Sequence, residues 1–445
     1  MTSDPRETIA ACATAAGTGG VAIVRVSGPA ALVIASAVTG VDAEAWGDRR
    51  LVRVAIVDRA GRRLDDGLAV AMRGPRSFTG EDVVELHVHG GAINVGIVMG
   101  AVVSAGARLA EPGEFTRRAL EAGKVTVAEA EAMLAVVSAP SSRAWVLAQD
   151  QLGGALARVV TAQRAAAATV LAELEARVDF PEEGLAPADV GALGGELERL
   201  AAAAATLERS FATGRVLGDG VVVAVVGAVN AGKSALVNAL VGAERVLVAD
   251  EPGTTRDYVE VRTVWDGVAV TLVDTAGERA AVADVERRGI ALGRARAAQA
   301  DLRLHVLGPG DSIPAEAGVG AAGGGELRVA SKGDLGWVTP AGMLVTSAVT
   351  GQGIQELRRE LIAFVGLADD AEAGSAVLLT ERQRAAAELA RRGFQAGAAG
   401  LLSGAPLELV AVDVRSAATA LASLEGDEVG EDVLDQLFAR FCIGK

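Results

Sequence analysis

The chain is poor in aromatic residues, cysteine and basic charge. Aromatic side chains make up 3% of its 445 residues, so the hydrophobic cores must be built from alanine, valine and leucine. The two cysteines, Cys12 and Cys442, lie near opposite ends, which argues against a disulfide scaffold and favours a reducing compartment. Acidic residues outnumber basic ones by 57 to 42, and the net charge of −15 argues against a broad basic surface for nucleic acid. RNA would therefore need a local basic site or a partner protein.

A long apolar segment is missing as well. The N-terminal residues 1–7 are polar and lack the apolar stretch of a signal peptide. Residues 90–107 carry no charge, close to the length of a membrane span of about 20 residues, but they include Asn94, Ser104 and several glycines. We expect a buried helix there, no membrane contact and a cytoplasmic protein.

The character of the sequence changes along the chain, and a chain of this length is expected to form more than one domain. Residues 1–120 alternate like the strands of an α+β domain. Alanine, leucine, glutamate and arginine recur at helical spacing over 121–214 and again over 376–445, while 215–375 alternate strands and helices. The pattern predicts a multi-domain α/β protein in which an α/β domain is inserted into a helical bundle made from two segments.

Hairpins are expected at two places. Residues 51–72 alternate with turns at Ala60-Gly61 and Asp66-Gly67, and Asp266-Gly267 joins two further strands. The second hairpin is the one antiparallel pair expected in the inserted domain.

Residues 227–234 read GAVNAGKS, a complete GxxxxGK[ST] phosphate-binding loop. A β-branched run at 221–226 precedes it and a helical pattern at 235–240 follows, which is the context this motif requires. The glycines let successive N–H groups point at phosphate oxygens, and the helix start adds its positive dipole end. Lys233 would supply a charge to the outer phosphates and Ser234 a hydroxyl to Mg2+.

Four further segments follow at the spacing of a small GTPase: residues 253–257 (GTTRD), 274–277 (DTAG), 331–334 (SKGD) and 347–348 (SA). The first two would form switch loops, with a threonine on Mg2+ and the γ-phosphate and Asp274 on the metal through water. Asp334 can accept two hydrogen bonds from guanine donors that adenine lacks. Each segment alone could be an ordinary loop, but four in this order predict a Mg2+-dependent GTP hydrolase in a Ras-like P-loop domain.

The candidate GTP-binding residues are Asn230, Ala231, Gly232, Lys233, Ser234, Ala235, Ala249, Thr254, Thr255, Asp274, Thr275, Ala276, Gly277, Ser331, Lys332, Asp334, Ser347 and Ala348. Ser234 and Thr255 are the candidate Mg2+ ligands.

Motifs outside the GTPase segment carry a resemblance. They are Ser77-Phe78-Thr79-Gly80-Glu81-Asp82, His89-Gly90-Gly91, residues 108–116 (RLAEPGEFT), residues 179–183 (DFPEE) and the final Phe441-Cys442-Ile443-Gly444-Lys445. With them, essentially the whole chain resembles the bacterial tRNA-modification GTPase family MnmE (TrmE).

The resemblance implies an N-terminal domain that forms a homodimer and binds a tetrahydrofolate derivative, either 5-formyl- or methylene-. It implies a flavoprotein partner, MnmG (GidA), in a heterotetramer or larger complex that meets tRNA. Such a pair adds a carboxymethylaminomethyl or aminomethyl group at C5 of the wobble uridine, and folate supplies one carbon.

By the same resemblance, the folate site maps onto Arg25, Glu85, Lys124 and Lys445. A pterin offers donors to a carboxylate such as Glu85, and the glutamate tail of folate attracts basic side chains. Glu85 and Arg25 could instead be surface charges on strands. Cys442 matches a functional thiol of the family, and a small buried hydrophobe is the alternative.

The resemblance further implies K+ held by Asn230, Ala249, Glu251 and Thr254, which would act on the phosphates as an arginine does elsewhere. Glu286 matches the glutamate that positions the attacking water, or it is a solvated helix charge. The candidate catalytic residues are Glu286, Lys233, Asn230 and Arg256.

Two departures from the family pattern stand out. Ser331 replaces the usual asparagine, which ties the base-reading loop to the phosphate loop, so nucleotide affinity could be weaker. Residues 15–20 (AAGTGG) replace a stiffer loop. The alternatives are a related GTPase of ribosome assembly and a nucleotide-gated scaffold with little catalysis.

Overall fold

The computed structural model describes residues 7–180, 187–242, 259–274, 300–311, 325–364, 376–426 and 429–445. The chain divides into two compact units, one made of 1–134 with 422–445 and the other of 135–421. Each unit contains a six-stranded sheet with helices, so the expected multi-domain α/β fold is confirmed. Within the described ranges, no helix combines the length and apolar character that crossing a membrane requires.

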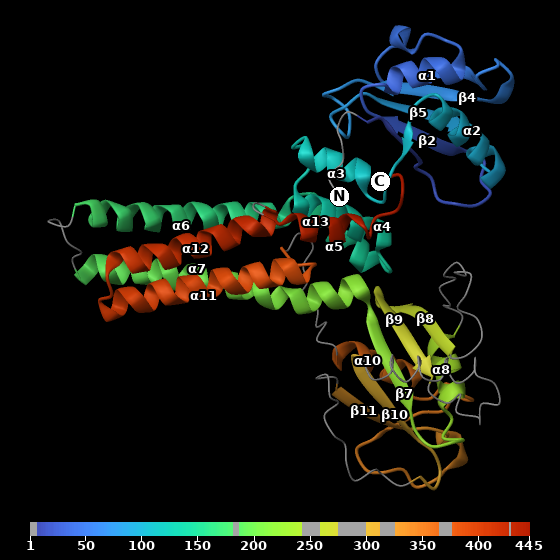
Figure 1. The fold of residues 1–445 in the computed structure, drawn as a ribbon. Coiled ribbons are helices and arrows are strands. Elements are labelled where there is room, and N and C mark those ends of the chain that lie inside the picture. Colours follow the sequence, from blue (N-terminus) through green and yellow to red (C-terminus); the bar gives the residue numbers. More distant parts are fainter. Residues whose placement is uncertain are drawn as a thin grey trace. The chain divides into compact units, whose positions relative to one another are not determined.

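The sheet of the first unit has the strand order β3-β4-β5-β2-β1-β6, and its strands β2, β4 and β5 are labelled in Figure 1. Its strands are β1 (Ile9–Cys12), β2 (Ala22–Ser27), β3 (Val52–Val57), β4 (Arg63–Met72), β5 (Val83–Val88) and β6 (Arg108–Leu109). Neighbouring strands are antiparallel except β1 and β6. Val24, Val26 and Leu86 on one face form a core with helices α1 (Ala31–Thr39) and α2 (Ala92–Ser104). Because strand side chains alternate, Arg25 and Glu85 lie on the other face.

Two expectations for this unit need correction. The turn at Ala60-Gly61 joins β3 and β4, but Asp66-Gly67 lies inside β4. Gly67 is there for close packing, because a side chain at that position would collide with the His87 carbonyl of β5. The uncharged stretch does form helix α2, but only one side is buried: Val98 is fully buried, whereas Ile93 is 81% exposed.

The chain end packs against helix α3 (Glu114–Glu121) of the same unit. An apolar cluster holds the end of helix α13 (Glu431–Phe438) in place. In this cluster Phe438 and Phe441 contact Val127, the first residue of helix α4 (Val127–Ser138). Beyond it, Ile443 pairs with Pro112 in an isolated β-bridge, and Gly444 lies against the backbone of Cys12 on strand β1. The last residues are thereby brought to the sheet.

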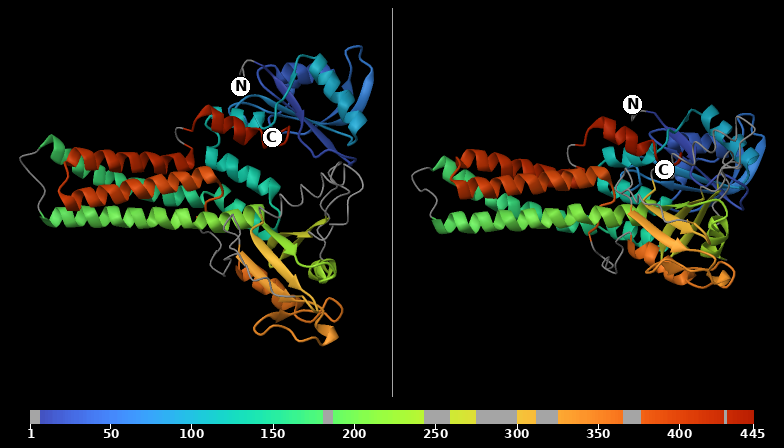
Figure 2. Two further views of the ribbon diagram at one scale, coloured as in Figure 1. Left: turned by 60° about the horizontal axis from the view of Figure 1, so that its bottom comes forward. Right: turned by 90° about the horizontal axis from the view of Figure 1, so that it is seen from below.

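The second unit contains long helices that are rich in alanine. They are α5 (Ser142–Leu152), α6 (Ala155–Asp179), α7 (Pro187–Asp219), α11 (Glu381–Ser403) and α12 (Leu407–Glu425). Small residues let the helices approach closely: Gly397 on α11 lies against Leu197 on α7, and Gly393 lies against Ala417 on α12. Helices α6, α7, α11 and α12 consequently run side by side (Figure 2).

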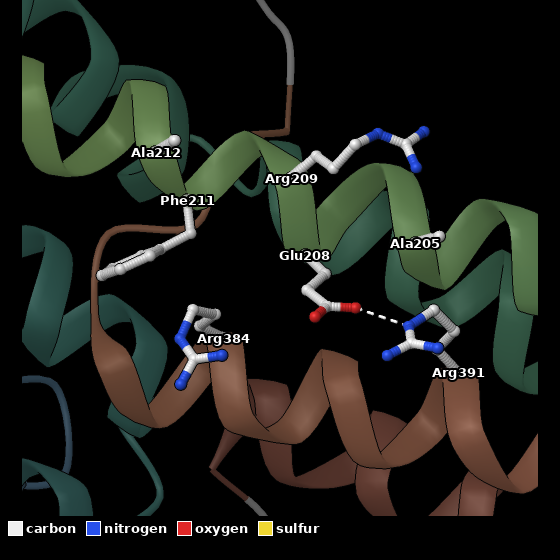
Figure 3. Close-up of a pocket in the computed structure, with 7 residues that line it drawn as sticks. All are labelled: Ala205, Glu208, Arg209, Phe211, Ala212, Arg384 and Arg391. Carbon is white, nitrogen blue, oxygen red and sulfur yellow. Dashed lines mark hydrogen bonds and ion pairs between the residues drawn. The ribbon is translucent and has the colours of Figure 1, made fainter. Parts of the chain in front are cut away.

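A hollow of about 590 Å³ lies between α7 and α11 and is lined by arginines (Figure 3). Arg391 binds Glu208 at 2.6 Å, and Arg384 binds Glu381 at 2.6 Å. Arg209 extends away from the hollow in Figure 3. Since two of the three arginines are matched by acids, the hollow is better explained as helix packing than as an anion site.

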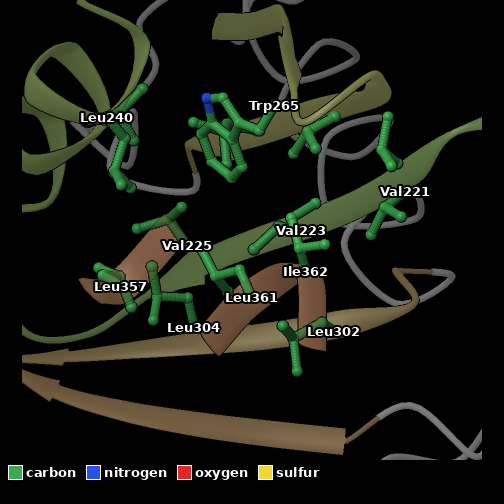
Figure 4. Close-up of a cluster of buried hydrophobic side chains, with 14 of the residues drawn as sticks. Val221, Val223, Val225, Leu240, Trp265, Leu302, Leu304, Leu357, Leu361 and Ile362 are labelled. Atoms are coloured by element: carbon green, nitrogen blue, oxygen red, sulfur yellow. The ribbon is translucent and has the colours of Figure 1, made fainter. Parts of the chain in front are cut away.

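The sheet of the second unit has the order β12-β11-β10-β7-β9-β8. Its strands are β7 (Val221–Val226), β8 (Val259–Trp265), β9 (Val268–Asp274), β10 (Leu302–Leu307), β11 (Gly325–Ala330) and β12 (Leu344–Val345). All neighbouring pairs are parallel except β8 and β9, the hairpin expected at Asp266-Gly267. Valines of β7 and leucines of β10 form a core with helices α8 (Lys233–Val241) and α10 (Ile354–Phe364) (Figure 4).

The chain enters and leaves this sheet at neighbouring points. Helix α7 leads directly into β7, and the returning residues 376–380 lie against that helix. The Leu378 N–H donates to the Ser210 hydroxyl at 3.1 Å, and a side chain at Gly214 would collide with the Leu378 carbonyl. This is the geometry that an inserted domain requires.

Candidate nucleotide-binding site

The phosphate-binding loop lies between strand β7 and helix α8, at the carboxyl edge of the parallel strands. Gly227 opens it with a φ of 147°, and a side chain there would collide with the Val306 carbonyl of β10. Asn230 and Gly232 also have positive φ values, 67° and 101°. These conformations curl the backbone in the way that a chain cradling phosphates needs.

Lys233 is the first residue of helix α8 and is 6% exposed. Its ammonium donates to the carbonyls of Gly227 and Ala228, both at 2.8 Å. A lysine ammonium has three N–H donors, so one is left to meet an anion in the loop. The loop thus holds its own positive charge at the place predicted for the outer phosphates.

Ser234 and Asp274 come together across the sheet. The Ser234 hydroxyl donates to the Asp274 carboxylate at 2.7 Å. Asp274 ends β9 and pairs in register with Val225 of β7, which places it beside the loop. A hydroxyl and a carboxylate in contact are oxygen ligands of the kind Mg2+ prefers.

The base-reading segment lies beside the same loop. Lys332 donates to the Asn230 carbonyl at 2.6 Å, and the buried Ser331 hydroxyl donates to the Ala231 carbonyl. The Asp334 carboxylate accepts a hydrogen bond from the Ser347 hydroxyl at 2.6 Å. Segments predicted separately, the phosphate loop, Asp274, 331–334 and 347–348, therefore converge on one edge of the sheet.

A second cluster lies on the sheet face of the first unit. Arg25 and Glu85 stand opposite each other on β2 and β5, and the Arg25 Nε donates to Glu85 at 2.9 Å. Arg25 also donates to the Gly444 carbonyl at 3.2 Å, and its guanidinium lies 5.7 Å from the centre of the Phe115 ring. The chain end, including Lys445, is thereby placed at this pair.

The other two residues predicted for this part of the protein, Lys124 and Cys442, are both exposed. Lys124 is exposed and lies beside Gly80, beyond the end of α3. Cys442 is exposed, so the alternative that it is a buried hydrophobe is wrong.

The two histidines near this face have different partners. His87 Nε2 lies 3.5 Å from Glu85, while His89 Nδ1 lies 2.7 Å from Asp65. Burial opposes ionisation of Asp65, but hydrogen bonds from His89 and Asn94 outweigh it and lower the pKa of that carboxyl. No cluster of three metal-ligating side chains occurs among the residues that the structure describes.

Comparison with known proteins identifies the family. Residues 8–124 match the domain described as the GTP-binding protein TrmE N-terminus, and residues 127–442 match the MnmE helical domain. The chain belongs to the MnmE family.

Relatives match it over almost the whole chain, as three examples show. The protein of Parvibaculum lavamentivorans is 42% identical over 440 residues, covering 99% of this chain and 100% of the relative. The protein of Synechococcus sp. CC9605 is 42% identical, covering 99% of both chains, and that of Chloroflexus aurantiacus is 40% identical, covering 99% of this chain and 100% of the relative. Each relative is named tRNA modification GTPase MnmE.

Several predicted site residues of this MnmE family member lie outside the described residues and stay predictions. They are Ala249, Glu251, Thr254, Thr255, Arg256, Thr275, Ala276, Gly277 and Glu286. Among the described residues, Ala235 and Ala348 directly follow Ser234 and Ser347, as the motifs require.

One residue of the site was missed by sequence analysis. The Trp337 indole donates to the Ser331 carbonyl at 2.9 Å and so belongs to the base-reading loop. It is one of only four tryptophans and lies six positions after Ser331. A rare large residue just past a binding motif is the one signal that could have drawn attention to it.

Proposed function

We propose that this member of the MnmE family binds and hydrolyses GTP at the carboxyl edge of the second sheet, as part of a tRNA modification system. The observation that carries the proposal is the convergence of a buried lysine, a Ser234–Asp274 oxygen pair and a carboxylate for guanine on that edge. Lys233 would neutralise the outer phosphates, and Asp334 would accept the guanine N1 and N2 donors.

We propose two cations for this reaction, and among the described residues Ser234, Asp274 and Asn230 carry oxygen atoms suited to them. Ser234 and Thr255 would hold Mg2+, with Asp274 acting through a water molecule, and the ion would draw electron density from the phosphate oxygens. Asn230, Ala249, Glu251 and Thr254 would hold K+. Asn230 is held in the left-handed conformation and Lys332 binds its carbonyl, so its backbone is fixed before any ligand arrives.

We also propose that the sheet face of the first unit takes a tetrahydrofolate derivative, 5-formyl- or methylene-. Arg25 and Glu85 form a cation–carboxylate pair with the chain end beside it, which suits a ligand with pterin donors at one end and a glutamate tail at the other. Lys445 and Lys124 would add positive charge for that tail, and Cys442 is exposed for chemistry at the same end of the chain.

In this proposal the protein acts in the cytoplasm as a homodimer with the flavoprotein MnmG (GidA). Together they would modify C5 of wobble uridine in tRNA. The net charge of −15 supports a partner that supplies most of the contact with RNA.

Two measurements test the enzyme. Calorimetry with GTP and ATP should give binding of GTP alone, and ATP binding of equal strength would contradict the assignment of Asp334.

Hydrolysis should require Mg2+ and run at least about tenfold faster in potassium than in sodium, because a fixed cation stabilises charge on the phosphates. Equal rates of hydrolysis in the two salts would contradict the proposed K+ site but not the proposed GTPase activity. Reconstitution with the flavoprotein, followed by mass spectrometry of wobble uridine, tests the tRNA role.

A further inference from the structure

Ser331 opens the base-reading loop, at the position where an asparagine was expected. Its side chain is 4% exposed, and its hydroxyl donates to the Ala231 carbonyl in the phosphate loop. Its backbone N–H donates to the Leu307 carbonyl at 2.8 Å, which anchors the residue to the end of β10. The expected loss of contact between the two loops is therefore absent, because the shorter side chain still reaches its partner.

The phosphate loop is shaped to accept this contact. A side chain at Gly232 would come within 3.1 Å of the Ser331 hydroxyl oxygen, so glycine leaves the hydroxyl room to approach. Lys332 donates to the neighbouring Asn230 carbonyl at 2.6 Å. Two successive residues of the base-reading loop thus hold two successive carbonyls of the phosphate loop.

Trp337 adds a second attachment on the other side of the loop. Its indole N–H donates to the Ser331 carbonyl at 2.9 Å, across the short helix Gly333–Leu335. Asp334 lies within the span that this bond closes. Both a hydroxyl and an asparagine carboxamide can accept a hydrogen bond, but the hydroxyl has one donor where the carboxamide has two. The indole supplies an attachment that the hydroxyl alone cannot.

We propose that Ser331 and Trp337 act together as positioning residues for guanine recognition. They hold the loop so that the Asp334 carboxylate stays at a fixed distance from the phosphate loop. Asp334 can then bind the guanine base while the phosphate loop binds the phosphates of the same nucleotide. Loss of either hydrogen bond makes the base-reading loop more mobile and leaves the carbonyl of Ala231 or Ser331 without that donor. The contact with the base then weakens, while the contacts with the phosphates remain. This inference rests on the proposed GTP site and names the residues that set its selectivity.

The test compares GDP with IDP, which lacks the 2-amino donor that Asp334 would read. Calorimetry in Mg2+ on the full chain gives both dissociation constants for the wild type and for Ser331→Ala, Ser331→Asn, Trp337→Phe and the double variant Ser331→Ala/Trp337→Phe. Ser403→Ala, which removes a hydroxyl from helix α11, and Trp145→Phe, at an exposed tryptophan of α5, are matched controls.

We expect Ser331→Ala to weaken GDP binding about tenfold and IDP binding less, as for loss of a buried hydrogen bond. Ser331→Asn should restore GDP binding to within about threefold, and Trp337→Phe alone should weaken it about threefold. Because both bonds restrain one loop, the effects in the double variant should not add.

Wild-type GDP binding and selectivity in both Ser331→Ala and Trp337→Phe would overturn the inference and leave the GTPase proposal intact. Equal losses of GDP and IDP without rescue by asparagine would also overturn it. If Ser331→Ala does not fold, Trp337→Phe decides by the same readout. A wild type that binds no guanine nucleotide would overturn the proposed function and this inference with it.

Discussion

At the scale of single residues, Gly227 shows how backbone geometry shapes the nucleotide site. Its φ of 147° is unfavourable for any residue with a side chain, and the Val306 carbonyl occupies the space that a side chain would need. We expect Gly227→Ala to lower the free energy of unfolding by about 2–4 kcal/mol and to weaken GTP binding more than tenfold. Urea denaturation and calorimetry measure the two effects.

Gly310 provides the control for this substitution. It has a φ of 86°, but no atom of the described residues lies within 4 Å of the place where its side chain would begin. Gly310→Ala therefore carries the backbone strain without the collision, and should cost about 1 kcal/mol with normal GTP binding. If the two variants behave alike, close packing against Val306 does not shape the loop.

At the scale of secondary-structure elements, Arg117 joins helix α3 to helix α13. It is 9% exposed, and its guanidinium binds Asp435 at 2.6 Å and Glu431 at 2.7 Å. Burial opposes its charge, but bonds with Asp435 and Glu121 outweigh this and raise the pKa of Arg117, so it stays charged. Because α13 leads into the tail that meets Arg25, the pair of bonds positions the chain end.

We expect Arg117→Met to release that chain end rather than unfold the protein. Both acidic partners are solvent-exposed, so the loss of stability should be limited to about 1–2 kcal/mol. Hydrogen exchange over residues 431–445 should rise, and folate affinity should fall because Gly444 no longer meets Arg25. Arg62→Met, at an exposed ion pair with Asp58, should change neither. Unchanged exchange in Arg117→Met would contradict the role of this arginine.

Glu114, in the first turn of α3, predicts a dependence of stability on pH. It is 4% exposed, and Arg108 donates to both carboxylate oxygens at 2.7 and 3.0 Å. Burial opposes ionisation, yet the bonds from Arg108 and from the Glu111 backbone outweigh it and hold the pKa of Glu114 below its ordinary 4.5. Since the folded pKa is the lower one, ionised Glu114 stabilises the fold above about pH 4.5, and this contribution is lost as the pH falls through the folded pKa.

Glu114→Gln should therefore lower the urea midpoint at pH 7 and reduce the loss of stability as the pH falls below about 4.5. Glu44→Gln, at a carboxylate whose side chain is 62% exposed, is the control and should keep the wild-type pH dependence. A Glu114→Gln variant as acid-sensitive as the wild type would show that other carboxylates dominate.

At the scale of the whole molecule, local patterns could be predicted from the sequence and long-range partners could not. The phosphate loop, its flanking strand and helix, and the β8–β9 hairpin are set by neighbouring residues, and each was predicted where it lies. The bonds of Arg117 to Asp435 and of Trp337 to Ser331 depend on which surfaces meet after folding. The prediction of a turn at Asp66-Gly67 was wrong for the same reason. Gly67 is required by close packing against the neighbouring strand β5 and not by a turn.

The point where the sheet of the second unit joins the helices allows one test of the whole architecture. Leu378 bonds to Ser210, and Gln151 of α5 donates to the Val377 carbonyl, so the helices bind the returning chain directly, while the Val377 side chain packs in the core of the sheet. We expect a chain in which a Gly/Ser linker of about eight residues replaces 220–376 to keep its helices, since such a linker spans about 16 Å. Circular dichroism should show cooperative melting, and GTP should no longer shift it.

Removal of helix α6 is the matched control for that excision. Val160, Ala167, Val170 and Leu174 of α6 are buried among the helices, so a linker in place of 155–179 should expose a core and abolish cooperative melting. The two excisions distinguish a segment that is only attached to the helices, residues 220–376, from helix α6, which forms part of their core. A chain without 220–376 that melts non-cooperatively would mean that the helical part depends on the GTPase segment for its own stability, and that nucleotide binding can act directly on helix packing.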